Sequence, residues 1–273
     1  AAPEVASDAR RERARWRAIN LRAAELRARE FDLVVDLTGN RYSAYFGFRL
    51  RPAASLGFDG GELSWLYSHC VADAERPGRH LSERPFRVLE PLLAGRGADA
   101  FAYALPLRPA PATCAHAEIA RECGLSGGAY YVLAPGAGWP EKEWGAAHFT
   151  AAGQRLAESG AQVVVSGSEA QRALLEAVAR GVTGAQVSCA PIGRTVALLQ
   201  RAAGVLCNDS ALGHLAAACG VRVAAVFTGA TDPTLYAPLG HAGQVRVFSE
   251  DTTAEQVAAH LLQSNPKAQG TNA

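Results

Sequence analysis

The feature that most restricts the fold of this chain is a regular alternation of short apolar runs and helical segments between residues 130 and 227. Short, continuous apolar runs are typical of strands that are buried on both faces of a parallel sheet. Repeated strand–helix units therefore predict an α/β fold with a doubly wound parallel sheet. We predict strands at Tyr130–Ala134, Gln162–Ser166, Gln186–Cys189, Gly204–Cys207 and Val223–Phe227, and helices at Ala146–Glu158, Glu169–Arg180, Arg194–Ala202, Ala211–Cys219 and Ala254–Leu262.

The N-terminal part of the chain predicts a second, less regular unit. A buried strand at Phe31–Leu37 is followed by a turn and a helix, whereas Gly and Pro residues between 52 and 80 predict loops and short pieces. Helical spacing returns at Glu83–Leu93. Pro106, Pro109 and Pro111 predict a linker, because proline stiffens the chain. We therefore divide the chain into domains at 1–110 and 111–250, followed by a last helix and a disordered tail at 251–273.

The first predicted helix is rich in arginine. It begins at the capping pair Ser7-Asp8, and Trp16 starts an apolar stripe at helical spacing. Interleaved glutamates favour a solvated face, while the alternative is a basic surface that approaches an acidic acceptor or a membrane. The arginines are Arg10, Arg11, Arg13, Arg15, Arg17, Arg22, Arg27 and Arg29.

Overall composition excludes several classes of protein. The formal net charge of +1 gives no global attraction to nucleic acid. No apolar run is long enough to span a bilayer, and no secretory signal is visible. Six cysteines without a C-x-x-C pair predict buried thiols in a reducing cytoplasm.

Small and polar residues follow the predicted strands, where α/β sheets bind their ligands. The first such loop contains Gly136, Ala137, Gly138 and Lys142. Small residues let backbone N–H groups approach an oxyanion, and a lysine adds a point charge. The loop predicts a phosphate site, although a Gly/Pro-rich loop of this kind is also often purely structural.

Two further loops follow the next strands. Glu169 can favour a helix N-terminus or bind the hydroxyls of a ribose, and the residues alone leave both interpretations open. The small, apolar Ala190-Pro191 segment forms either one wall of a base pocket or a plain loop.

The segment from Asn208 to His214 joins the fourth predicted strand to a helix. Its helix start offers N–H groups that attract phosphate. Asp209 and Ser210 are good N-caps, and His214 lies one helical turn beyond Ser210. Together with Lys142, these side chains form a polar cluster that a simple core does not need. No G-x-G-x-x-G follows a strand, so a dinucleotide oxidoreductase is disfavoured.

These motifs resemble the ADP-heptose:lipopolysaccharide heptosyltransferase family. Three segments carry the resemblance, which covers most of residues 30–262. It implies a GT-B fold with two Rossmann-like domains, the N-terminal one without its first strands, and inverting transfer of a heptose. The segments are Pro135-Gly136-Ala137 with Lys142-Glu143-Trp144, then Asn208-Asp209-Ser210 with His214 to Ala218, and Phe227 to Pro233 with Pro238-Leu239-Gly240.

The resemblance also implies roles for single residues. Lys142, the small-residue loop and Ser210 with the following N–H groups, including that of Ala211, would hold the diphosphate, and Lys142 would stabilise the leaving group. Asp209 would accept hydrogen bonds from the sugar, Glu169 would bind the ribose, and Ala190 and Pro191 would flank the adenine. Neither a metal ion nor another cofactor is expected. On the acceptor side, the candidates are Asn40, Arg41, Tyr42 and Arg49.

The chain departs from the family pattern at two places. Ala211 stands where the family usually has glycine. The family's general base is an aspartate after its first strand, and nothing upstream of Ser7 resembles that segment, so we expect this base to lie upstream in a longer enzyme.

The expected function is transfer of a heptose from ADP-heptose, or from a related nucleotide sugar, to an anionic glycolipid, the lipopolysaccharide inner core. We expect this in the cytoplasm, at the inner face of the bacterial inner membrane. The alternatives are a catalytically impaired paralogue that only binds nucleotide sugar, and a transferase with a protein or small-molecule acceptor.

Overall fold

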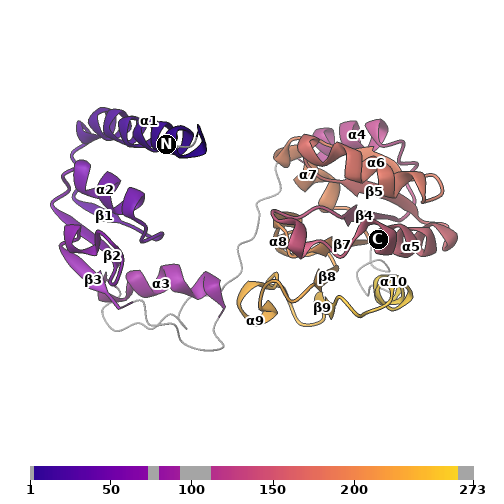
Figure 1. The fold of residues 1–273 in the computed structure, drawn as a ribbon. Coiled ribbons are helices and arrows are strands. Elements are labelled where there is room, and N and C mark those ends of the chain that lie inside the picture. The colour runs from indigo at the N-terminus through magenta and orange to yellow at the C-terminus, as the bar shows by residue number, and fades with distance from the viewer. Residues whose placement is uncertain (1–2, 73–79, 93–111, 264–273) are drawn as a thin grey trace. The chain divides into compact units, whose positions relative to one another are not determined.

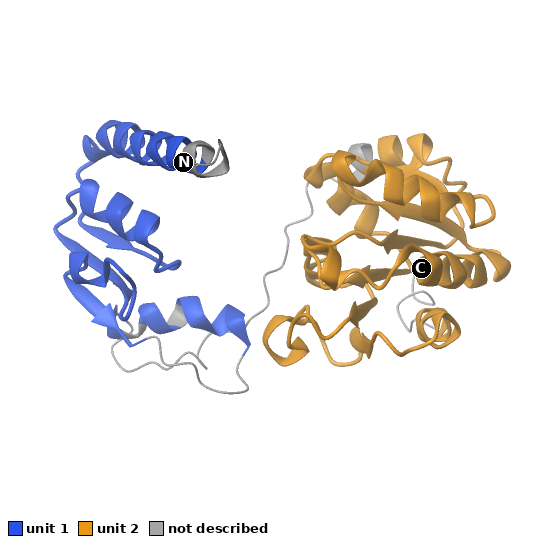
Figure 2. Ribbon diagram, in the orientation of Figure 1, with its two compact units in different colours: residues 1–102 blue, residues 103–273 orange. Residues whose placement is uncertain are grey.

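The computed structural model describes residues 3–72, 80–92 and 112–263. Contacts divide the chain into unit 1, residues 1–102, and unit 2, residues 103–273 (Figure 2). The predicted linker prolines, the boundary at residue 110 and the predicted tail at 264–273 lie outside the described residues. Each unit contains its own parallel sheet and its own buried core.

Unit 2 is a doubly wound α/β unit, as the alternation predicted. Its six strands are all parallel and lie in the order β6-β5-β4-β7-β8-β9. This is the Rossmann order, which changes direction between the first and fourth strands, here β4 and β7. The strands are β4 (Tyr130–Ala134), β5 (Gln162–Ser166), β6 (Gln186–Ser188), β7 (Gly204–Asn208), β8 (Val223–Phe227) and β9 (Val245–Ser249).

Helices cover both faces of this sheet (Figure 1). One face packs against α5, α6 and α10, and the other against α4, α7 and α8. Strands buried on both faces explain why Val132, Val164 and Val205 are fully buried. The helices are α4 (Ala112–Glu122), α5 (Ala146–Glu158), α6 (Arg172–Arg180), α7 (Ile192–Leu199), α8 (Ala211–Ala218), α9 (Pro233–Tyr236) and α10 (Ala254–Leu262), with 3₁₀ turns η5 (Pro140–Lys142) and η6 (Glu169–Gln171).

Most predicted elements of unit 2 are confirmed, with shifts at helix starts. α6 begins only at Arg172, because Glu169–Gln171 forms the separate 3₁₀ turn η6. The predicted helix from Arg194 to Ala202 instead spans Ile192–Leu199, since Pro191 is its N-cap and its carbonyl accepts the N–H groups of Arg194 and Thr195. Elements α4, α9 and β9 had not been predicted.

Unit 1 contains a three-stranded parallel sheet in the order β1-β2-β3. The buried side chains Leu56, Phe58 and Val88 form its core. The elements are α1 (Pro3–Arg27), β1 (Leu33–Val35), α2 (Arg41–Arg49), β2 (Ala54–Phe58), η1 (Ser64–Leu66), β3 (His69–Val71), η2 (Leu81–Glu83), α3 (Arg84–Val88) and η3 (Glu90–Leu92).

Between residues 52 and 80 the sequence predicted loops and short pieces, and short elements are present, but the prediction missed that one of them, β2, is the central strand of this sheet. Gly57 hid it. A Cβ at Gly57 would lie 2.3 Å from the ring of Tyr67, so this strand needs a glycine where a sequence pattern suggests a break.

Three other predictions for unit 1 also need correction. α1 begins at Pro3, so Asp8 lies inside the helix and does not cap it; proline is well tolerated in a first helical turn. β1 ends before Asp36, whose carboxylate accepts the N–H groups of the following turn. The predicted helix at Glu83–Leu93 is broken into η2, α3 and η3, and Pro85 and Pro91 lie near the breaks.

Helix α1 packs on α2 through an aromatic cluster. The ring of Trp16 lies 5.0 Å from that of Tyr42 and 5.1 Å from that of Tyr45. The Arg41 guanidinium ties the two helices together by an ion pair with Glu12 at 2.9 Å. The apolar stripe of α1 is therefore the face that it turns toward α2.

Candidate functional site

The candidate site lies at the carboxyl ends of β4 and β7, the neighbouring strands at the point where the sheet order changes direction. Asn208, at the end of β7, is fully buried. Its amide Nδ2 donates to the carbonyl of Pro135 at 2.7 Å, and its Oδ1 accepts the N–H of Trp144 at 3.0 Å. One side chain thus fixes both ends of the loop that follows β4.

Lys142 and Asp209 form a buried ion pair in this site. Lys142 Nζ lies 2.6 Å from Asp209 Oδ2, and the two side chains are 14% and 8% exposed. The Thr231 hydroxyl, from the loop after β8, donates to the same carboxylate oxygen at 2.7 Å. The loops after β4, β7 and β8 therefore meet at the Asp209 carboxylate. The sequence predicted that Lys142 and Asp209 lie in one polar cluster, and the structure confirms it.

The small-residue loop after β4 is held by two side chains. The N–H of Ala137 donates to Glu143 Oε1, and the carbonyl of Ala137 accepts from Gln171 Nε2, both at 3.2 Å. A Cβ at Gly136 would lie 2.3 Å from this Gln171 nitrogen, so a side chain at this position would displace the Gln171 amide from the loop. At Gly138 a Cβ would meet no neighbouring atom, and its role is not steric.

Ser210 precedes the first turn of α8. It is the N-cap by position, but its hydroxyl makes no capping bond, although Oγ is buried and has no hydrogen-bond partner. The first N–H groups of a helix have no intrahelical acceptors, so this turn presents donors beside Asp209. Ala211 and His214 are both exposed, on the first two turns of the same helix.

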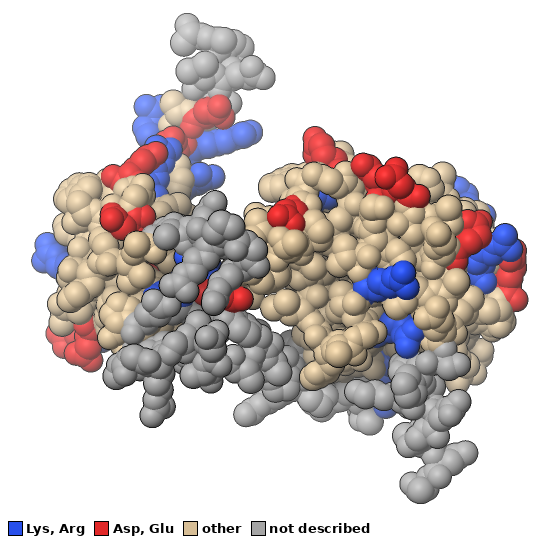
Figure 3. Space-filling model, turned by 90° about the horizontal axis from the view of Figure 1, so that it is seen from below, with Lys and Arg blue, Asp and Glu red and all other residues tan. Residues whose placement is uncertain are grey.

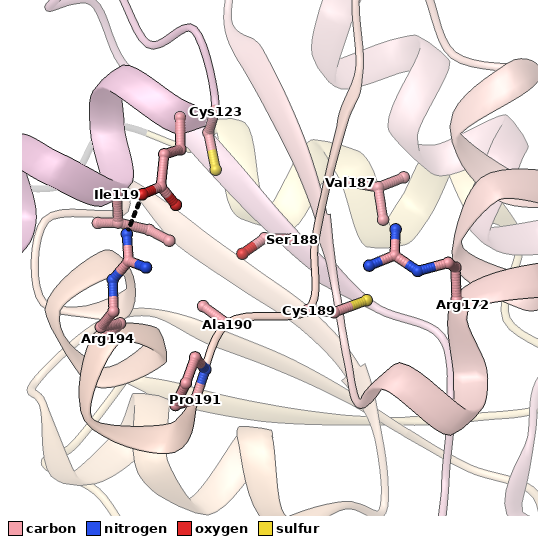
Figure 4. Close-up of a pocket in the computed structure, with 10 residues that line it drawn as sticks. Ile119, Cys123, Arg172, Val187, Ser188, Cys189, Ala190, Pro191 and Arg194 are labelled. Atoms are coloured by element: carbon pink, nitrogen blue, oxygen red, sulfur yellow. Dashed lines mark ion pairs between the residues drawn. The ribbon is translucent and has the colours of Figure 1, made fainter.

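The remaining predicted donor residues gather around a second feature, a pocket of about 240 Å³ at the end of β6 (Figure 4). Ala190 and Pro191 line one side of it, and Arg172 lies on the other. Glu169 does not line the pocket. Its carboxylate binds Arg172 with two hydrogen bonds of 2.6 and 2.7 Å, and the arginine lowers the pKa of this carboxyl.

The far wall of this pocket comes from α4, which the sequence had not predicted. Ile119 and Cys123 contribute apolar surface, and Glu122 forms an ion pair of 2.6 Å with Arg194 (Figure 4). The pocket is therefore a slot of mixed character, in which apolar side chains lie between two arginines. Gln171, next to Arg172 in the chain, connects this region to the loop after β4.

In unit 1 the acceptor-side candidates are engaged in structural contacts. The Asn40 side chain caps α2 by accepting the N–H groups of Tyr42 and Ser43. Arg41 binds Glu12 and the Tyr42 hydroxyl. The guanidinium groups of Arg15 and Arg41 each lie 4.9 Å from the centre of the Tyr42 ring.

Several residues of these sites were missed from the sequence. These are Thr231, Gln171 and Arg172. The first two bind residues distant in the chain, Asp209 and Ala137, and Arg172 binds Glu169 one helical turn away. Two of them left a signal: Ser168 and Gln171 have the spacing of a capping box, which the structure contains, and Thr231 lies in the segment from Phe227 to Pro233 that carries the resemblance.

Within the described ranges, no group of three His, Cys, Asp or Glu side chains is arranged to hold a metal ion. No helix among these residues has the length and apolar character needed to cross a membrane.

Comparisons with known proteins agree with this geometry. No curated protein sequence is significantly similar to the chain. Among solved structures, a family 9 glycosyl transferase from Veillonella parvula is similar over 92% of this chain and 79% of its own, with a TM-score of 0.78 and 20% identity.

Two Escherichia coli structures are also similar. The ADP-heptose lipopolysaccharide heptosyltransferase II matches with a TM-score of 0.74 and 20% identity, over 89% of this chain and 79% of its own. Heptosyltransferase WaaC, solved with ADP, matches with a TM-score of 0.70 and 22% identity, over 92% of this chain and 80% of its own. These structures share the GT-B fold of two Rossmann-like domains.

The sequence profile of glycosyltransferase family 9 (heptosyltransferase) matches residues 21–264, which cover most of both units and every residue of the two sites in unit 2. The chain is thus a glycosyltransferase that belongs to family 9, the heptosyltransferase family.

Proposed function

We propose that the protein transfers a heptose from ADP-heptose to the inner core of lipopolysaccharide, with inversion at the anomeric carbon and without a metal ion. The observation that carries the donor half is the Ser210 hydroxyl, buried without a partner at the start of α8 and next in the chain to the carboxylate that holds Lys142. A buried hydroxyl without a partner is costly, and a diphosphate oxygen would accept a hydrogen bond from it.

The charges of the site suit a leaving diphosphate. When the glycosidic bond breaks, negative charge develops on the β-phosphate. The Lys142 ammonium and the N–H groups of the first turn of α8 would stabilise that charge in a site where water is largely excluded.

The pocket at the end of β6 would hold the base. Ala190 and Pro191 offer the apolar surface that an adenine ring needs, and Glu169 lies beside it, bound to Arg172. The acceptor hydroxyl also needs a general base that removes its proton during the transfer.

The basic helix α1 supports an acceptor in a membrane. Its outward arginines would approach anionic headgroups at the cytoplasmic face of the inner membrane. Figure 3 shows blue side chains that project from this end of unit 1.

Calorimetry with ADP and a transfer assay with ADP-heptose and an inner-core acceptor test the proposal. We expect Lys142→Ala to lower kcat by about 10²–10³-fold, the range found when one stabilising donor is removed from a developing oxyanion. Unchanged turnover in Lys142→Ala would contradict the role of this lysine. Binding of ADP-heptose without transfer would instead favour a nucleotide-sugar-binding paralogue, and UDP-linked sugars test which base is preferred.

A further inference from the structure

Two exposed aromatic rings flank the Lys142 ammonium. Trp139, in the loop after β4, is 63% exposed, and its ring centre lies 4.7 Å from Lys142 Nζ. Tyr236, in α9 after β8, is 38% exposed, and its ring centre lies 5.7 Å from the same atom. Neither ring belongs to a buried core cluster of unit 2.

A tryptophan this exposed is unusual, because indole rings are mostly buried in folded proteins. The contact with the ammonium, about 0.5–1 kcal/mol at an exposed position, explains only part of its placement. Large exposed rings beside a polar cluster are typical of sites that bind a flat, partly apolar ligand.

The order of the strands indicates which part of a nucleotide sugar these rings would contact. The base pocket lies at the end of β6, on one side of the β4–β7 crevice, and the loop after β8 that contains Thr231 and Tyr236 lies on the other side. A nucleotide sugar is a linear molecule in the order base, ribose, diphosphate and sugar. With the base at β6 and the diphosphate at Lys142, the sugar would extend toward β8.

We propose that Trp139 and Tyr236 form the sugar subsite of the donor and determine which sugar is accepted. This inference rests on the proposed function. The rings stack against the C–H face of the sugar, while Asp209, held by Thr231, accepts hydrogen bonds from its hydroxyls. The sugar is thereby recognised by Trp139 and Tyr236, whereas the base of the nucleotide is recognised by the pocket at the end of β6.

The test compares the affinities of the full chain for ADP and ADP-heptose by calorimetry. In Trp139→Ala we expect the Kd for ADP-heptose to rise about tenfold, which corresponds to 1.4 kcal/mol, while the Kd for ADP changes less than about twofold. Tyr236→Ala should act in the same direction, and Trp139→Phe should retain most of the affinity. The matched control is Trp65→Ala, since Trp65 is 74% exposed in η1 of unit 1.

Each other outcome contradicts a specific step. Equal weakening of ADP and ADP-heptose would place Trp139 against the nucleotide and overturn the inference, as would unchanged affinity for both. Equal affinities of the parent chain for ADP and ADP-heptose would mean that no sugar subsite exists. If the parent chain binds neither ligand, the proposed function itself fails, and this result is distinguishable from the others.

Discussion

At the scale of single residues, the site depends on the Asp209 carboxylate. This side chain is almost fully buried and receives both the Lys142 ammonium and the Thr231 hydroxyl on one oxygen. Breaking a buried ion pair by removing one partner leaves a charge without compensation, which costs more than the pair itself contributes.

We therefore expect Asp209→Asn to lower the free energy of unfolding by about 3 kcal/mol. The double variant with Lys142→Gln should be less destabilised than the sum of the single losses, because it removes both charges. Urea unfolding of the four proteins measures this coupling. The control is Glu158→Gln, whose exposed pair with Arg155 should contribute less than about 1 kcal/mol. If the loss in the double variant equals the sum of the two single losses in free energy of unfolding within about 0.5 kcal/mol, the coupling is contradicted.

Cys207, a buried residue of β7, should make the free energy of unfolding depend on pH in the alkaline range. Burial, and to a smaller extent the charge of Asp209, raise the pKa of its thiol to about 12. The unfolded thiol ionises near pH 9 while the folded thiol does not, so the unfolded state gains stability as pH rises between these values.

The free energy of unfolding should thus fall with rising pH above about 9, with a contribution from Cys207 of up to about 1.4 kcal/mol per pH unit. Denaturant titrations at several pH values measure this slope, and Cys207→Ala should reduce it. The exposed Cys70 is the comparison. Burial also raises the pKa of its thiol, but by less, so Cys70→Ala should reduce the slope less than Cys207→Ala does. An unaltered slope in Cys207→Ala would mean that other groups control the alkaline response.

At the scale of elements, hydrophobic periodicity predicted the strands and helices whose bounds are set by their own residues. Strands β4, β5 and β8 and helices α5 and α10 have the predicted bounds, because each is an uninterrupted apolar run or a helical stripe. Strand β2 was missed, since contact with Tyr67 imposes a glycine on it. Strand β9 was also missed. Three of its five residues are exposed at the sheet edge, so its pattern carries little apolar signal.

The same limit applies to the candidate sites. Lys142 and Asp209 were predicted to lie together because both follow strands of a parallel sheet, whose carboxyl ends meet at one edge, and in the structure these strands, β4 and β7, are neighbours. Trp139, Tyr236 and Thr231 were not, because their relation to Lys142 or Asp209 depends on the path of irregular loops.

Helix α1 carries two rows of exposed arginine side chains, and in the second row the Arg15 guanidinium lies over the Tyr42 ring of α2. Helical spacing places Arg10, Arg13 and Arg17 in one row and Arg11, Arg15 and Arg22 in another, and all six are exposed. Glu12 is turned toward α2 and Glu25 binds Arg22, so the acidic residues neutralise only part of this charge.

We expect the protein to bind vesicles that contain phosphatidylglycerol. Replacing Arg11, Arg13 and Arg17 by glutamine should weaken binding about 100-fold, since each arginine near an anionic surface contributes about 1 kcal/mol. Co-sedimentation measures the partition, which should also fall with added salt. The control replaces the exposed Arg121, Arg180 and Arg201 of unit 2. Equal binding to phosphatidylcholine vesicles, or equal loss in the control, would contradict this role of α1.

At the scale of the whole molecule, two units with separate cores predict that each responds to its own changes. Gly57→Ala should destabilise unit 1 by about 1–3 kcal/mol, the usual cost of overpacking, because its methyl group would displace the Tyr67 ring. ADP at 100 times its Kd should stabilise unit 2 by about 2.7 kcal/mol.

Scanning calorimetry should show the two effects on different transitions. Gly57→Ala should lower one Tm, and ADP should raise the other. The control is Gly128→Ala, where a Cβ meets no neighbouring atom, and it should leave both Tm values nearly unchanged. A single transition that moves with both changes would show that the units unfold together.

The ion pair between Lys142 and Asp209 also affects selectivity. Before the donor arrives, the lysine charge is already neutralised, so an incoming anion must compete with a carboxylate held 2.6 Å away. The free energy of anion binding is then the difference between the ion pair that Lys142 forms with the anion and the one that it loses with Asp209. An isolated inorganic anion gains little from this exchange. Only a ligand whose other parts fill neighbouring subsites would displace the carboxylate, which would then be released to accept hydroxyl groups. The ion pair in this sense protects the site against the simple phosphates that are abundant in a cell.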